Sequence, residues 1–251
     1  MLSVAVLCSR RAPGLSYLLE SDANRGRTYE LTAVVTSDPE CVERERVTEA
    51  GVTYAVHDIR AFYAARGATL RDLDHRPEYD LLTARLLARF RPDLVLLCGY
   101  LHIVTAPLLQ AYPDRVLNIH DSDLAQVDDQ GRPRYRGLHA VRDAIFAGEH
   151  ETRSSVHVVT PEVDGGPLLL RSWAFETHPL VDAAREWGAT DMLRAYAYAQ
   201  REWMMRAAWG PLLAAAIDLA ARGEIRVRDG HPRTISAAAT RVSGREAVAA
   251  W

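Results

Sequence analysis

Short and almost wholly apolar runs recur along the first part of the chain, and a helical pattern separates each run from the next. The runs cover residues 2–8, 31–36, 52–56 and 93–98. A strand that is apolar on both faces has to be covered on both faces, as strands of parallel sheets are. The order strand, helix, strand therefore predicts an α/β fold with a doubly wound, mostly parallel sheet.

The helices expected between these strands are marked by capping residues and by apolar spacing. Asp38 followed by Pro39 predicts a helix start, and Gly51 predicts its end. Further helical segments are expected at residues 15–24, 61–66, 79–90 and 138–147, the last of them closed by Gly148.

The C-terminal part is helical from residue 190 onward. Gly210-Pro211 is expected to break this run, with a second helix continuing to about Arg222. Trp187, Trp203 and Trp209 are expected in the core. We predict a catalytic domain over residues 1–228. Residues 229–251 are expected to form a C-terminal hairpin and a loose tail. The hairpin would pair residues 231–235 with residues 224–228 at the end of the catalytic domain.

Composition excludes several classes of protein. A chain of 251 residues with 48% apolar residues can build a sizeable core, and its net charge of −3 gives no basic field for nucleic acid. No apolar run of 18 residues and no signal-like segment is present, so we expect a cytoplasmic protein without a membrane span. Cys8, Cys41 and Cys98 lack the spacing of a disulfide framework or zinc knuckle.

The stretch at residues 115–124 carries the clearest site signal. An apolar run ends there in two polar side chains, Asn118 and His120, whose spacing of two residues puts them on the same side of a strand. Open α/β sheets bind ligands at the carboxyl ends of their strands. Residues 99–104 directly follow the preceding strand, so we expect them at the same edge as a pocket wall.

Asn118, His120 and Asp164 form the candidate catalytic set. An amide N–H and an imidazolium can together stabilise an oxyanion, and a nearby carboxylate can hold the imidazole charged or accept a proton. Each of these residues alone is more often a satisfied polar group at the end of a strand. It is the combination that indicates catalysis.

The loop after the first strand, residues 9–14, lies where doubly wound folds bind anions. The loop has few glycines, so a phosphate cradle of backbone amides is only weakly indicated. Arg10 and Arg11 could contact an anion through their side chains, or they could be solvated surface residues, and the sequence leaves both open. There is no GxGxxG after this strand, which argues against a nicotinamide enzyme.

Several motifs occur together in a fixed order along the chain. They are Pro-Asp-Leu-Val-Leu-Leu-Cys-Gly-Tyr ending at Tyr100, Asn-Ile-His ending at His120, Arg-Tyr-Arg-Gly-Leu-His at 134–139, and Ser-Val-His followed by Asp-Gly-Gly-Pro at 155–167. The combination resembles the folate-dependent formyltransferase family over residues 2–228. Glycinamide ribonucleotide formyltransferase, methionyl-tRNA formyltransferase and formyltetrahydrofolate hydrolase belong to this family, which has a Rossmann-like fold.

The resemblance implies a role for each matching residue. Asn118 and His120 would polarise the formyl group of 10-formyltetrahydrofolate, while Asp164 would keep His120 protonated and relay the proton of the attacking amine. The donor's pterin would lie against residues 100–104 and against the loop at 161–164, and His157 would support that loop. The donor-binding residues are expected to be Tyr100, Leu101, His102, Ile103, Val104, Pro161 and Val163, with His157, and no metal is implied.

Departures from the family pattern concern the acceptor. His-Pro-Ser-Leu-Leu-Pro of the family is His-Asp-Ser-Asp-Leu-Ala at 120–125, an insertion follows at 127–132, and the glycine-rich loop is replaced. The residues expected to bind the acceptor are Arg10, Arg11, Gly14, Asp121 and Asp123. Because both aspartates would repel a phosphate, the main expectation is formyl transfer to a primary amine of another small molecule in a specialised pathway.

Three alternatives stay open. In purine synthesis the acceptor would be glycinamide ribonucleotide, with Arg10 and Arg11 holding its phosphate. The same set could activate water, as in a 10-formyltetrahydrofolate hydrolase, or the chain could be a binding protein without turnover. The expected partners are folate and a small amine, a homodimer is left open, and neither nucleic acid nor membrane is expected.

Overall fold

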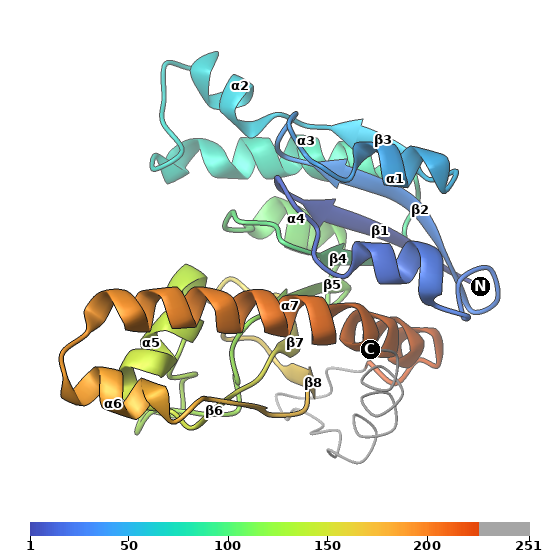
Figure 1. The fold of residues 1–251 in the computed structure, drawn as a ribbon. Coiled ribbons are helices and arrows are strands. Elements are labelled where there is room, and N and C mark those ends of the chain that lie inside the picture. Colours follow the sequence, from blue (N-terminus) through green and yellow to red (C-terminus); the bar gives the residue numbers. More distant parts are fainter. Residues whose placement is uncertain (226–251) are drawn as a thin grey trace.

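The computed structural model describes residues 1–225, which form a seven-stranded sheet flanked by helices (Figure 1). Its order is β3-β2-β1-β4-β5-β7-β8; β1 to β5 run parallel to one another, whereas the pairs β5–β7 and β7–β8 are antiparallel. The predicted doubly wound, mostly parallel sheet is confirmed. The strands are β1 (Leu2–Cys8), β2 (Tyr29–Thr36), β3 (Thr53–Val56), β4 (Leu94–Leu97), β5 (Val116–His120), β7 (Ser155–Val158) and β8 (Leu168–Arg171).

The helices lie on both faces of this sheet. They are η1 (Tyr17–Ser21), α1 (Arg44–Glu49), α2 (Ile59–Ala64), η2 (Leu73–His75), α3 (Arg76–Ala88), α4 (Ala106–Ala111), η3 (Gly137–His139), α5 (Ala140–Ala147), α6 (Leu180–Glu186) and α7 (Thr190–Ala221). A separate two-stranded sheet pairs β6 (Glu151–Thr152) with β9 (Phe175–Glu176).

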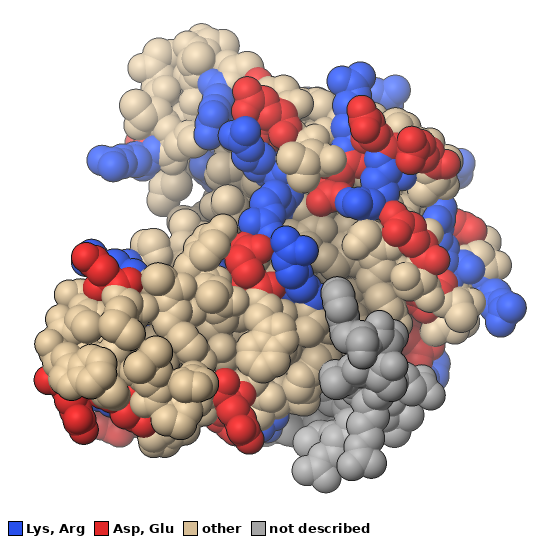
Figure 2. All heavy atoms as spheres, in the orientation of Figure 1, with Lys and Arg blue, Asp and Glu red and all other residues tan. Residues whose placement is uncertain are grey.

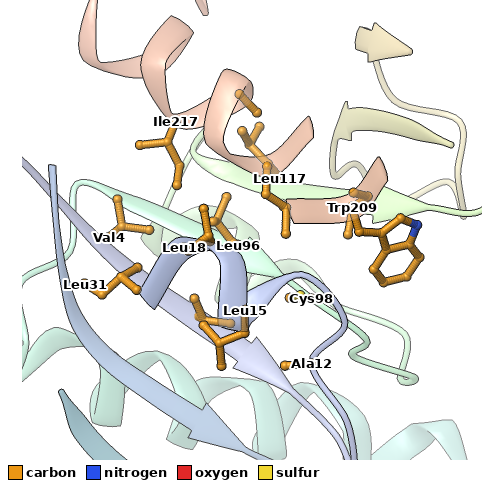
Figure 3. Packing of buried hydrophobic residues seen from close by; sticks show 14 of the residues in the cluster. Val4, Ala12, Leu15, Leu18, Leu31, Leu96, Cys98, Leu117, Trp209 and Ile217 are labelled. Carbon is orange, nitrogen blue, oxygen red and sulfur yellow. The ribbon is translucent and has the colours of Figure 1, made fainter. Parts of the chain in front are cut away.

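Alternate residues of β1 belong to different cores, as the pleat of a strand requires. Val4 and Val6 pack on the face covered by η1, α1 and α7 (Figure 3). Ala5 and Leu7 pack on the opposite face, against α3 and α4. Both faces of the strand are therefore buried, which explains why its sequence is apolar without alternation.

The C-terminal helix differs from its prediction. Gly210-Pro211 does not break it: α7 is one helix of 32 residues that contains Pro211. A Cβ atom on Gly210 would lie 2.3 Å from Cβ of Tyr17, so this glycine permits close packing of α7 on η1. Extensive burial of this part of α7 explains how the helix tolerates a proline.

The tryptophans were only partly predicted. Trp209 is buried in the core, as expected, but the side chains of Trp187 and Trp203 are 69% and 53% exposed. Trp203 still packs edge-on against Phe175. Helical spacing alone therefore overestimated the width of the buried face of α7.

Three further boundaries differ from expectation. Asp38 does not begin a helix, since its side chain accepts from the backbone N–H of Glu40 in a turn and α1 starts only at Arg44. The segment expected to be helical over 15–24 is the short η1, and the strand that the sequence predicts over 168–175 is divided into β8 and β9. Apart from residues 224 and 225, which are in no strand, the predicted hairpin and tail lie outside the described residues. No helix in residues 1–225 is long and apolar enough to cross a membrane.

Candidate active site

A cavity of about 590 Å³ opens at the carboxyl ends of β4 and β5, where the sheet changes from parallel to antiparallel pairing. Its volume is in the range of pockets that enclose a small molecule. Asn118, His120 and Asp164 all line it. The structure thus brings together the three residues that the sequence nominated: Asn118 and His120 lie on β5, and the loop after the antiparallel strand β7 brings Asp164 to within 3.5 Å of His120.

His120 lies at the centre of the site. Its side chain is 10% exposed, and its Nε2 is 3.5 Å from Oδ2 of Asp164. Among the described residues Nε2 has no hydrogen-bond partner, although it is buried. A buried imidazole nitrogen without a partner at a cavity wall is available to a ligand.

Asp164 is held in a fixed position by its backbone and its neighbours. Its φ angle is +53°, a left-handed conformation that is uncommon for aspartate and often found at functional sites. Oδ2 accepts a hydrogen bond of 2.8 Å from the backbone N–H of Gly137. Burial alone would raise the pKa of Asp164, but its contacts with His157 and His120 and the N–H of Gly137 outweigh it and lower this pKa to about 2. Asp164 is therefore a carboxylate at neutral pH.

His157 connects Asn118 with Asp164. Its Nδ1 lies 3.0 Å from the carbonyl oxygen of Val158, which can only accept, so Nδ1 is the donor. Its Nε2 is 3.1 Å from Nδ2 of Asn118 and 3.5 Å from Oδ1 of Asp164. One N–H of the Asn118 amide is thus used to orient the amide, and the other remains for a ligand.

The expected donor-binding segments form the walls of the same cavity. All of their nominated residues line it: Tyr100, Leu101, His102, Ile103, Val104, His157, Pro161 and Val163. Leu101, Ile103 and Val163 are 42–52% exposed, so these apolar side chains are available to cover a flat aromatic ring. Burial lowers the pKa of His102 to about 4, which makes it neutral at pH 7.

Sequence reasoning missed two arginines that line the cavity. Arg76 begins α3 and is only 2% exposed; its Nε donates to the hydroxyl of Tyr63, while its buried Nη1 has no partner in the described part of the chain. Arg201 lies on α7, whose residues were read as core packing. Neither arginine belongs to a motif, and only the fold brings them to the cavity.

The loop after β1 does not line the cavity. Arg10 forms an exposed ion pair with Glu40, and Arg11 binds both carboxylate oxygens of Glu202 at 2.9 and 2.8 Å. Gly14 has a φ angle of +90° and packs on α7, where a Cβ atom would lie 2.8 Å from the backbone nitrogen of Gly210.

The two aspartates after His120 are buried and paired with arginines. Asp121 accepts a hydrogen bond from Nε of Arg201, and Asp123 lies 3.0 Å from Arg171 and 3.7 Å from Arg153. Of the two aspartates, only Asp121 lines the cavity. The expectation that both would repel a phosphate is weakened, because each negative charge is opposed by a guanidinium.

Comparison with known proteins identifies the family. The family model described as formyl transferase matches residues 2–178, well over half of the chain. The chain belongs to the formyl transferase family. In residues 1–225 of this formyl transferase, no group of three or more His, Cys, Asp or Glu side chains could hold a metal ion.

The similar proteins are named for formyl transfer to glycinamide ribonucleotide or for purine biosynthesis. Phosphoribosylglycinamide formyltransferase of Escherichia coli is 30% identical over 171 residues, which is 68% of this chain and 72% of that enzyme. The trifunctional purine biosynthetic protein adenosine-3 of Drosophila melanogaster is also 30% identical over 171 residues, but these make up only 11% of that longer protein. The crystal structure of glycinamide ribonucleotide transformylase 1 from Symbiobacterium toebii is 29% identical, with a TM-score of 0.67 and 92% of each chain covered. This formyl transferase is therefore a 10-formyltetrahydrofolate-dependent N-formyltransferase.

Proposed function

We propose that the protein transfers the formyl group of 10-formyltetrahydrofolate to the primary amine of glycinamide ribonucleotide. The observation that carries the reaction is the meeting of Asn118, His120 and Asp164 at one cavity wall, with Nε2 of His120 free to face a substrate. The acceptor is supported by the relatives, which are named for this acceptor or for purine synthesis. Of the acceptors that the sequence leaves open, glycinamide ribonucleotide is therefore better supported than an amine from a specialised pathway.

The side chains of the site suit attack of an amine on a formyl carbon. Negative charge develops on the formyl oxygen as the amine adds, and the free N–H of Asn118 together with an N–H of His120 can stabilise it. The amine must lose a proton, and Asp164, ionised at neutral pH, can accept it directly or through water. The proton then goes to the departing folate nitrogen, so that the catalytic groups return to their starting state.

The donor fits the cavity in shape and charge. Apolar side chains from the loop after β4 and the loop after β7 form walls for the pterin. Folates also carry a glutamate with two carboxylates, and the buried guanidinium of Arg76 has an unused N–H. A buried donor without an acceptor is costly, so a ligand carboxylate would be a favourable partner for Nη1 of Arg76.

The identity of the acceptor can be tested by an assay that compares amines. The purified protein is incubated with 10-formyltetrahydrofolate and either glycinamide ribonucleotide or a panel of other primary amines, with folate absorbance and product mass followed. We expect efficient formylation of the ribonucleotide, with kcat/KM of ~10⁴ M⁻¹s⁻¹ or more. Preference for another amine would support an acceptor from a specialised pathway. Consumption of 10-formyltetrahydrofolate without any amine would support a hydrolase.

A further inference from the structure

An ion pair beside the catalytic histidine ties β5 to the C-terminal helix. Asp121 directly follows His120, is 4% exposed, and has its Oδ1 3.8 Å from Nδ1 of His120. Its other oxygen accepts a hydrogen bond from Nε of Arg201, 80 residues further along the chain. The family pattern that the sequence resembles has proline instead of Asp121. This pairing is therefore a departure of this chain from that pattern.

Arg201 presents unused donors to the cavity. Its side chain is 31% exposed and lines the cavity, and only its Nε is bound to protein. Within residues 1–225 its two terminal nitrogens have no hydrogen-bond partner. A guanidinium that is fixed at Nε and free at both terminal nitrogens offers donors that match the oxygens of a phosphate.

Asp164 and Asp121 lie beside different nitrogens of His120. Asp164 faces Nε2 of the imidazole, whereas Asp121, which holds Arg201, faces Nδ1. Asp164 and the carboxylate that holds Arg201 are thus separated by the imidazole ring. This separation suits an acceptor with its amine at one end and its anionic group at the other.

Backbone amides of the loop after β1 are poorly available for the same task. The N–H of Ala12 is directed at Oε1 of Glu43, 3.4 Å away, and Pro13 has no N–H to give. Arg11, also on this loop, is occupied by both oxygens of Glu202. The terminal nitrogens of Arg201, which lines the cavity, are therefore better placed for an anion than Ala12, Pro13 or the side chain of Arg11.

The local charge balance permits an anion. Basic and acidic side chains lie side by side above the middle of α7 (Figure 2). The charged neighbours of Arg201 are Asp121, to which it is bonded, and Glu202, which is also paired with Arg11 and Arg206. Three arginines against two carboxylates leave this group with a net charge of +1.

We propose that Arg201, positioned by Asp121, binds the phosphate of the acceptor. The inference rests on the proposed acceptor, glycinamide ribonucleotide, and extends it by naming the side chain that recognises the phosphate. It assigns Asp121 a positioning role, in place of the repulsive role that the sequence suggested. It also makes α7 part of the acceptor site.

The test compares acceptor binding by the native protein and by Arg201→Gln. Calorimetric titration with glycinamide ribonucleotide should show a Kd at least ~10-fold higher for the variant, because a charge-assisted contact is lost. KM for the ribonucleotide should rise similarly and KM for the folate should not change. With the dephosphorylated ribonucleoside as acceptor, kcat/KM should be the same for both proteins. An equal loss for both acceptors, or no loss, would overturn the inference.

Two further variants keep the result interpretable. Arg194→Gln, on the same helix with a 64% exposed side chain, is the matched control and should bind like the native protein. Asp121→Asn combined with Arg201→Gln removes both buried charges. Recovery of ribonucleotide binding in this double variant would mean that an unpaired Asp121 caused the loss, and would overturn a direct role of Arg201.

Direct binding also separates this inference from the proposed function. Native protein that binds the ribonucleotide through Arg201 but does not formylate it would refute the proposed function and support the phosphate site. Formylation of the ribonucleotide that does not depend on Arg201 would support the proposed function and refute the phosphate site. Absence of any binding of the ribonucleotide to the native protein would refute both.

Discussion

Replacing Asp164 by asparagine separates its charge from its shape. Asparagine can still accept the N–H of Gly137, now bonded at 2.8 Å, but it cannot accept a proton from an amine or stabilise a charged His120 at 3.5 Å. We expect Asp164→Asn to lower kcat by at least ~100-fold, the usual effect of losing one group that acts on transition-state charge. Folate binding should change little, since the pterin walls are untouched.

The same substitution has a predictable effect on stability. The pKa of Asp164 is lowered from 3.8 to about 2, and at ~1.4 kcal/mol per unit this corresponds to about 2 kcal/mol. A lowered carboxylate pKa stabilises the folded state above pH 3.8, and that stabilisation is lost as the pH falls through 2. By pH 3 about 1 kcal/mol of it should be gone.

Urea unfolding of the native protein and of Asp164→Asn at pH 5 and pH 3 measures the stabilisation that the Asp164 carboxylate provides. Because all other carboxylates are common to the two proteins, they cancel in the difference between their free energies of unfolding. That difference should shrink by about 1 kcal/mol between pH 5 and pH 3. A difference that does not depend on pH, or a variant with near-native kcat, would refute the role that we derive for Asp164.

Three further outcomes follow from the structure. His120→Ala should lower kcat by at least ~100-fold in steady-state assays without weakening folate binding, and near-native turnover would contradict the proposed mechanism. Gly210→Ala should lower the free energy of unfolding by ~1–3 kcal/mol despite the helix propensity of alanine, because the added methyl meets Tyr17; an unchanged melting temperature would count against this packing. Cys41, whose pKa is lowered to about 6 by its hydrogen bond with another thiol, should be alkylated before Cys98, whose pKa is raised by burial, as peptide mass mapping would show.

Features encoded by local pattern were predicted well. The residues of β1 and the polar end of β5 could be located because strands buried on both faces have to be apolar along their whole length. Asn118 and His120 then had to lie at the carboxyl edge of the sheet, where the structure also places Asp164. Topology sufficed for this, since parallel strands end at a common edge.

Features that depend on contacts between distant segments could not be predicted. Gly210 was read as a helix breaker because local propensity disfavours it, whereas its role is to let η1 approach α7. The sequence showed Asp121 as a negative charge, but its partner is 80 residues away, and no local pattern links the two. Cys8 and Cys41 are likewise far apart in the sequence, yet their sulfur atoms are 3.9 Å apart.

α7 lies beyond the segment that the family model matches, and yet it reaches the cavity. The family model ends at residue 178, whereas α7 starts at Thr190 and still supplies Arg201 to the cavity wall. A chimera that keeps residues 1–178 and receives the corresponding helix of a relative, with the packing at Gly210 retained, would keep Asn118, His120 and Asp164 and replace Arg201. Under the proposed role of Arg201, such a chimera should change recognition of the acceptor more than the transfer step.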